Sequence, residues 1–136
     1  MDMEDWNGNW YWAEYSNFSV GSDTDKYKLH VSGFDPCSTA GDSLLGSTIT
    51  NADTEWRLVD GMAFSTIDID NDKGPFSCAI SKRAGWWFNN CLYALPTGEY
   101  INHEYIGTTG GGVNWFATFG NYYSFKKMSM SLISQK

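Results

Sequence analysis

The sequence is poor in the features that mark a nucleic-acid-binding or membrane-spanning chain. Nine Lys and Arg residues stand against sixteen Asp and Glu, the net charge is −7, and no basic run occurs. Basic clusters are what bind phosphate backbones and anionic lipid surfaces, so neither nucleic acid nor membrane insertion is expected. No apolar run approaches the roughly 20 residues that a membrane-spanning helix needs.

Histidine is also scarce, and no recognised catalytic motif accompanies it. The only two are His30 and His103, and neither belongs to a recognised catalytic motif. Catalysis needs a positioned base or nucleophile, so the sequence predicts no enzyme. His30 lies in an alternating stretch and is expected on a strand face, because no cluster of metal ligands is near it in sequence.

Cysteine is rare, and its count of three is odd. Cys78 and Cys91 enclose a tryptophan-rich loop and are expected to pair, which leaves Cys37 over. Disulfides persist in oxidising compartments, so the prediction of a secreted protein depends on this pair. Asn17-Phe18-Ser19 is an N-glycosylation sequon and a weaker sign of export. The acidic segment 1–5 does not resemble the basic start of a signal peptide.

Aromatic residues are abundant instead, with seven Trp, eight Tyr and eight Phe. Such residues favour strands and build binding surfaces. A near-alternating pattern predicts a strand over 9–20, irregular near Asn17, and a second, antiparallel strand over 27–32. Further extended segments are expected at 64–67, 113–116, 122–125 and 128–132.

Between these segments the chain is rich in loops. Residues 33–54 interleave Gly, Asp, Pro, Ser and Thr, and Asp42 or Ser43 is expected to cap one helical turn around Leu44 and Leu45. No internal repeat, linker or long helical period occurs. The predicted class is α+β, with a short-stranded antiparallel sheet, few short helices and a loop-rich C-terminal part.

The stretch 68–91 carries the clearest chemistry. Asp68, Asp70 and Asp72 alternate in a loop with Gly and Pro, and Ca²⁺ takes roughly six to eight oxygen ligands from carboxylates and carbonyls. An EF-hand is excluded, because its twelfth position would be Ala79, where that loop needs Glu. Two interpretations of the residues stay open: a compact Ca²⁺ loop or a solvated Asp-rich turn.

Residues across nearly the whole chain resemble the fibrinogen-related domain. The likeness centres on Phe64-Ser65-Thr66-x-Asp68-x-Asp70-Asn71-Asp72, then Cys78-Ala79, Gly85-Trp86-Trp87 and Cys91. It extends upstream through Tyr15, Phe18, Val20-Gly21, Tyr27-x-Leu29 and 40–44, and downstream through Gly98-x-Tyr100, Gly112-Val113-x-Trp115, 123–126 and Met130. The family includes fibrinogen chain ends, ficolins, tachylectins, tenascins and angiopoietins.

The resemblance implies a partial fibrinogen-like domain over residues 1–136. A central sheet region is expected at about 1–66, and a calcium- and ligand-binding subdomain at about 67–136. Family members carry a further N-terminal subdomain, which this sequence lacks, so either a fragment or an unusually short member is implied. A full-length protein of this kind is expected to be secreted and oligomeric.

The same resemblance implies one bound Ca²⁺. Its ligands are the side chains of Asp70 and Asp72 and the backbone carbonyls of Gly74 and Phe76, with Asp68 in support. A cis peptide bond at Asn90–Cys91 and a neighbouring ligand pocket are also implied. The pocket positions are Phe88, Asn90, Cys91, Leu92, Thr109, Gly110 and Tyr122.

The sequence departs from lectin-like members at two of these places. Leu92 stands where His is usual, which removes a polar contact, and 95–97 replaces the usual Asn-Leu-Asn. Phe88 and Leu92 are equally consistent with core positions, because both residue types are commonly buried.

An extracellular calcium-binding recognition module is the function implied. The first hypothesis is lectin-like binding of acetylated or other glycans in innate defence. The alternative is a protein-binding domain in adhesion, matrix or receptor signalling. The expected partner is therefore a glycan or acetylated small ligand, or an extracellular protein.

Overall fold

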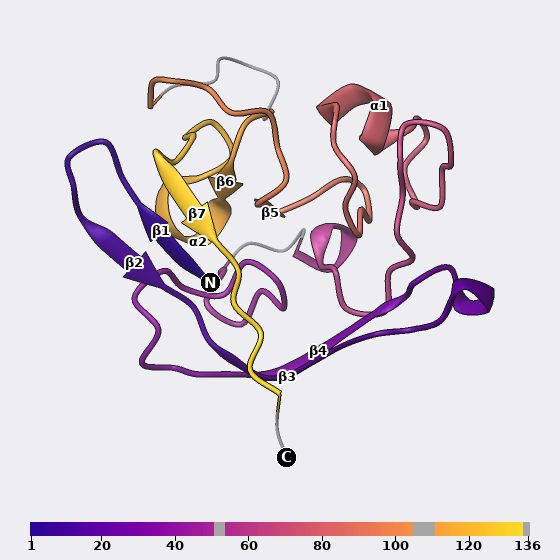
Figure 1. Cartoon of the computed structure of the whole chain (residues 1–136), viewed down its shortest axis with the longest axis horizontal. Coiled ribbons are helices and arrows are strands. Elements are labelled where there is room, and N and C mark those ends of the chain that lie inside the picture. Colours follow the sequence, from indigo (N-terminus) through magenta and orange to yellow (C-terminus); the bar gives the residue numbers. More distant parts are fainter. Residues whose placement is uncertain (51–53, 105–110, 135–136) are drawn as a thin grey trace.

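Three small antiparallel sheets form the framework of the protein in a computed structural model that describes residues 1–50, 54–104 and 111–134 (Figure 1). In the first, β1 (Asp2–Glu4) lies between β2 (Trp10–Trp12) and β7 (Lys127–Ser129). The second pairs β3 (Tyr15–Val20) with β4 (Leu29–Phe34), and the third pairs β5 (Ala94–Leu95) with β6 (Asn114–Trp115). The predicted α+β class with short antiparallel strands is confirmed.

The helices are short and lie in the connections between strands. They are α1 (Cys78–Lys82), α2 (Phe116–Phe119) and the 3-10 turns η1 (Asp23–Asp25) and η2 (Thr54–Arg57). Ser77 caps α1, because its hydroxyl accepts a hydrogen bond from the Ile80 amide at 3.3 Å. Within the described ranges, no helix has the length and apolar character needed to cross a membrane.

β3 and β4 form a long ribbon along the lower edge of Figure 1, as the alternating pattern predicts. The register pairs Phe18 with Val31 and Asn17 with Ser32, so apolar and polar residues face opposite sides. Leu29 and Val31 are buried, whereas His30 is exposed on the strand face where it was expected.

The predicted irregularity near Asn17 is wrong, because the break in the first long strand lies at Ala13 and Glu14. At this point the chain leaves one sheet for another. The Ala13 amide donates to the Met1 carbonyl at 2.9 Å, and the Glu14 amide donates to Ser38 Oγ at 3.0 Å. Beyond them the chain enters β3 and pairs with β4.

β1 was not predicted, although it is the central strand of its sheet. Met3 is fully buried and lies in register with Tyr11 on one side and Met128 on the other. Glu4 forms an ion pair with Lys127 at 2.8 Å, and the Lys127 ammonium lowers the pKa of the Glu4 carboxyl. A three-residue strand is too short for its alternation to be recognised in sequence.

Two of the predicted extended segments end early. At 64–67 only Ser65 pairs, with Trp86, because Thr66 and Ile69 exchange backbone hydrogen bonds that turn the chain. At 113–116 the strand is limited to β6, and Phe116 begins α2.

The last part of the chain is also less regular than predicted. Residues 122–125 form no strand in the described structure, although the Phe125 amide donates to the Val113 carbonyl at 2.8 Å. The final strand covers Lys127–Ser129 only, so Met130 and Leu132 lie beyond it and are exposed.

The core is built largely from aromatic side chains. Trp86, Phe88, Trp115 and Phe125 are among its largest fully buried members. Buried indole rings need an acceptor for the N–H group. Trp115 Nε1 donates to the Gly41 carbonyl at 3.0 Å, which fastens the loop-rich segment 33–50 to the core.

A buried carboxylate organises that same segment. Asp42 Oδ1 accepts from the Tyr15 hydroxyl and the Leu45 amide, both at 2.8 Å, and Oδ2 accepts from the Ser47 amide and hydroxyl. The predicted capping by Asp42 is confirmed, although the capped unit is a turn over 43–45 and not a helix. Burial and the Asp42 charge raise the pKa of Tyr15.

Replacing Asp42 with Ala is expected to lower the free energy of unfolding by roughly 3 kcal/mol or more. Hydrogen bonds to charged groups contribute about 1.5–3 kcal/mol each, and the substitution leaves buried donors without an acceptor. Urea unfolding of the two proteins measures the difference.

Asp25→Ala is the matched control, because Asp25 forms an exposed ion pair with Lys28 at 3.3 Å. Such pairs contribute about 0–1 kcal/mol. A loss for Asp42→Ala as small as that for Asp25→Ala would contradict the assigned importance of the buried carboxylate.

Candidate functional site

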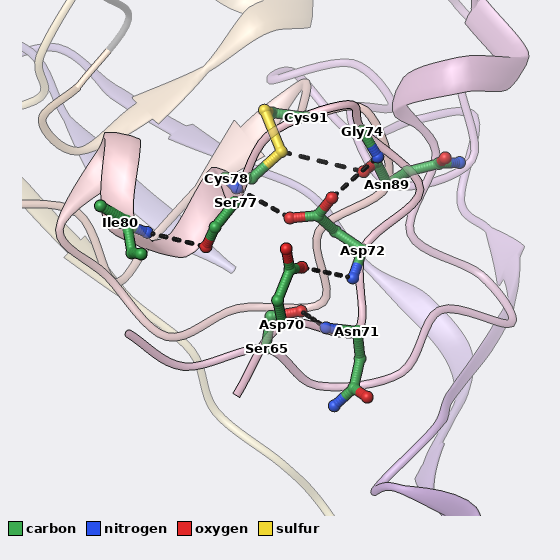
Figure 2. Close-up of a disulfide and its surroundings, with 10 residues drawn as sticks. All are labelled: Ser65, Asp70, Asn71, Asp72, Gly74, Ser77, Cys78, Ile80, Asn89 and Cys91. Atoms are coloured by element: carbon green, nitrogen blue, oxygen red, sulfur yellow. Dashed lines mark hydrogen bonds between the residues drawn. A yellow bond between two sulfur atoms is a disulfide. The ribbon is translucent and has the colours of Figure 1, made fainter. Parts of the chain in front are cut away.

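A disulfide between Cys78 and Cys91 is the fixed point of the candidate site (Figure 2). The sulfur atoms are 2.10 Å apart and the Cα atoms 5.6 Å apart. Cys78 begins α1 and is fully buried, and Cys91 is half-buried. The predicted pairing is confirmed, and Cys37 is a free, exposed cysteine.

Hydrogen bonds fold the aspartate loop onto this disulfide. Asp72 Oδ1 accepts from the Gly74 amide, and Asp72 Oδ2 accepts from the Cys78 amide, both at 2.7 Å. Asp70 Oδ1 accepts from the Asp72 amide at 3.1 Å. The backbone of the loop therefore positions both carboxylates, which approach one another in Figure 2.

Two carboxylates in this position repel one another. Burial raises the pKa of Asp72 and the Asp70 carboxyl raises it further, while the hydrogen bonds from the Cys78 and Gly74 amides oppose this rise. Ionising both groups is therefore costly for the loop. A cation held between them would offset the repulsion.

Oxygen atoms from three residues converge around Gly74. A Cβ atom at this position would lie 3.1 Å from Asp72 Oδ1, 3.2 Å from the Phe76 carbonyl oxygen and 3.3 Å from Asn90 Oδ1. Carboxylate, carbonyl and amide oxygens are the ligands that Ca²⁺ takes in proteins. The residues present therefore fit this ion.

The third aspartate does not join the convergent oxygens. Asp68 Oδ1 accepts from the Thr66 hydroxyl at 2.7 Å, which lowers the pKa of the Asp68 carboxyl. In the part of the chain that the structure describes, no three His, Cys, Asp or Glu side chains form a metal-binding group. The ligand set of Asp70, Asp72, Gly74 and Phe76 thus depends on backbone carbonyls and stays a prediction.

Two of the predicted pocket residues lie in the core. Phe88 is 0% exposed and Leu92 is 4% exposed. Both belong to the buried cluster that also contains Trp86 and Trp115. Their positions agree with the core interpretation that the sequence left open.

The other predicted pocket residues are nearer the surface or outside the described ranges. Asn90 is exposed, and the peptide bond from Asn90 to Cys91 is cis, as expected. Tyr122 is exposed on a turn. Thr109 and Gly110 lie outside the described residues, so the complete pocket stays a prediction.

The sequence did not predict that η2 lies against the cysteine loop. The Asn90 amide donates to the Trp56 carbonyl at 2.7 Å, and Asn89 Nδ2 donates to the carbonyls of Glu55 and Leu58. η2 therefore braces the loop from more than thirty residues away in sequence. The Trp56 side chain is 62% exposed beside this contact. No local sequence pattern signals this contact between η2 and the cysteine loop. The only signals are the residue types themselves, two asparagines and a tryptophan.

A separate hollow of about 450 Å³ lies beside β7. Its lining includes Trp10, Tyr100, Phe125 and Met128, and none of the predicted ligand residues that the structure describes. The hollow and the cysteine loop are thus different features of the surface.

The chain is similar in sequence to a family of known proteins. The family model for the fibrinogen beta and gamma chains, C-terminal globular domain, matches residues 1–135. Fibrinogen-like protein 1 of Bos taurus is 36% identical over 132 residues, which are 97% of this chain and 41% of the relative. The Homo sapiens fibrinogen gamma chain is 35% identical over 141 residues, covering 98% of this chain and 31% of the relative.

Solved structures show the same fold. The lamprey fibrin D-dimer, complexed with the peptide ligand Gly-His-Arg-Pro-amide, matches with a TM-score of 0.83 and 25% identity over 99% of this chain and 47% of that chain. The fibrinogen-like globe domain of human ANGPTL6 matches with a TM-score of 0.78 and 29% identity over 92% of this chain and 50% of that chain.

These matches agree in family and in extent. The chain spans less than half the length of the two curated relatives and about half of the two solved chains. The family match covers nearly every residue of the chain itself. The chain belongs to the family of fibrinogen C-terminal globular domains.

Proposed function

We propose that this chain is a calcium-stabilised recognition module of an extracellular fibrinogen-like protein, and that it binds a cationic segment of another protein. One observation carries the proposal: beside the disulfide, the oxygen-lined loop around Gly74 contains the exposed Phe76, and Asn90 next to it is hydrogen-bonded to the backbone of the exposed Trp56. The proposed activity is binding, and no catalytic step is assigned to the chain.

Calcium has a structural part in this proposal. Asp70 and Asp72 supply side-chain oxygens, and Gly74 and Phe76 supply carbonyl oxygens. The ion favours the charged form of Asp72, whose pKa is raised by burial and further by the Asp70 carboxyl. Because Asp72 also accepts from the Cys78 amide, ordering this carboxylate orders the loop up to the disulfide.

The proposed recognition surface consists of Trp56, Phe76 and Asn90. The Phe76 side chain is 82% exposed and Trp56 is 62% exposed. Asn90 Oδ1 lies near Gly74, and the Asn90 backbone amide donates a hydrogen bond to the Trp56 carbonyl. Exposed aromatic residues are enriched among the side chains that dominate protein interfaces. The polar Asn90 side chain can form directional hydrogen bonds with a bound partner.

Charge favours a basic partner. The net charge of −7 attracts cationic segments and speeds their encounter with the chain. The lamprey fibrin structure supports the same choice, because the peptide in complex with it contains His and Arg. A short basic peptide of this kind is therefore the proposed type of ligand.

Lectin-like binding of acetylated glycans in innate defence is the second candidate. Asn90 and Trp56 favour it, because both are exposed and joined by a backbone hydrogen bond, and sugars combine polar groups with an apolar face. Leu92 weighs against it, since Leu92 is buried and its side chain offers no polar atom to an acetyl group. Protein recognition therefore ranks first.

Ca²⁺ is expected to raise the melting temperature, and Asp70→Ala or Asp72→Ala is expected to abolish the rise. A ligand at 100 times its Kd stabilises the folded state by about 2.7 kcal/mol. Thermal unfolding followed by circular dichroism, with calcium or with a chelator, measures the effect.

Asp68→Asn is the matched control, because it changes a carboxylate that bonds to Thr66 outside the proposed ligand set. This variant should keep most of the calcium response. An equal response in the wild-type protein, Asp70→Ala and Asp72→Ala would contradict the calcium site.

Gly-His-Arg-Pro-amide is expected to bind the calcium-loaded chain, and an analogue with Glu in place of Arg is expected to bind more weakly. Trp56→Ala should reduce the affinity by roughly 30-fold, the effect of losing about 2 kcal/mol at an interface hot spot. Isothermal titration calorimetry provides both affinities.

Trp10→Ala is the control, because Trp10 is 57% exposed but lines the hollow beside β7. It should leave the affinity unchanged. N-acetylglucosamine in excess should also leave peptide binding unchanged. Equal binding of the two peptides would contradict a cationic partner, whereas competition by the sugar would favour the glycan candidate.

A further inference from the structure

The acceptor sequon Asn17-Phe18-Ser19 lies on the outward face of the β3–β4 ribbon. It is the only place in the sequence where an asparagine is followed two positions later by Ser or Thr. Asn17 and Ser19 are both exposed. Their partners in the antiparallel register, Ser32 and His30, are exposed as well. The ribbon is therefore polar and open to solvent at these four positions, whereas the next pair on the same face, Tyr15 and Phe34, is half-buried.

The middle residue of the sequon points the other way. The Phe18 ring packs edge-on against Trp87 with its centroid 5.9 Å away, and its register partner Val31 is buried. Successive side chains of a strand alternate between its two faces. The same alternation that sends Phe18 into the core thus projects Asn17 and Ser19 away from it.

The Asn17 side chain has room for a substituent. Its Nδ2 atom donates to Ser16 Oγ and to Ser32 Oγ, both at 3.2 Å. An asparagine that carries a sugar keeps one N–H group, so one of these hydrogen bonds survives. The other is exposed, and water replaces it at little cost.

We propose that Asn17 carries an N-linked glycan. The inference rests on the extracellular location in the proposed function, because the reaction belongs to chains that enter the secretory pathway. The glycan would cover the outer face of the ribbon and leave the side that packs on Trp87 untouched. The recognition surface at Trp56, Phe76 and Asn90 then stays separate from the modified face.

The modification is a group transfer from a lipid-diphosphate-linked oligosaccharide. Asn17 Nδ2 forms a bond to the anomeric carbon of the first sugar. The bond from that carbon to the phosphate oxygen breaks, and the lipid diphosphate leaves with the electron pair. The amide nitrogen loses one proton, and nothing is oxidised or reduced. Ser19 supplies the hydroxyl that the acceptor motif requires, and Phe18 satisfies the exclusion of Pro between them.

The test is expression of the full 136-residue chain with a secretion signal in a eukaryotic cell. Peptide N-glycosidase should increase the gel mobility of the secreted protein, and mass spectrometry should locate the conversion of asparagine to aspartate at position 17. Recovery of Asn17 only in unmodified form would overturn the proposal.

Two variants at the exposed Ser19 form a matched pair. Ser19→Ala removes the acceptor hydroxyl and should abolish the mobility shift, whereas Ser19→Thr keeps a hydroxyl and should retain it. A shift that persists in Ser19→Ala would contradict the assignment to Asn17. Glycan occupancy is read without calcium or ligand, so its failure is distinct from failure of the calcium and peptide experiments.

Discussion

The Asp72 carboxylate is the constraint on which the geometry of the candidate site depends. Its two oxygens accept from the Gly74 and Cys78 amides, so one side chain closes the loop and joins it to the start of α1. The disulfide continues the connection to Cys91, and the preceding Asn90 bonds to η2. Three segments far apart in sequence thereby share one anchor. This anchor is disfavoured in its charged form, because burial and the Asp70 carboxyl both raise the pKa of Asp72.

Tryptophan N–H groups connect the irregular segments in the rest of the fold. Trp87 Nε1 donates to the Tyr27 carbonyl at 2.7 Å, and Trp115 Nε1 donates to the Gly41 carbonyl at 3.0 Å. Each indole fills the core and satisfies a loop carbonyl at the same time. A chain with strands this short cannot rely on sheet hydrogen bonds alone, and its aromatic content supplies the missing long-range contacts.

Sequence patterns predicted the parts of the structure that are encoded locally. Alternation over 27–32 identified β4, and the position of Cys78 and Cys91 around a tryptophan-rich loop identified the disulfide. The missing parts depend on distant contacts. β1 is too short to show a period, and Trp56 approaches Asn90 only through the fold. The start of α2 at Phe116 was missed because the aromatic run around it is as typical of a strand as of a helix.

The sheet formed by β1, β2 and β7 has a consequence for the order of folding. Its central strand comes from the first residues of the chain and one of its edges from nearly the last, in the register that pairs Met3 with Met128. During synthesis, Met3 cannot pair with Met128 until most of the chain has left the ribosome. The β3–β4 hairpin pairs close neighbours and can form early. This sheet is therefore completed only once residues 127–129 have been made, and until then one edge of β1 stays unpaired and prone to aggregation.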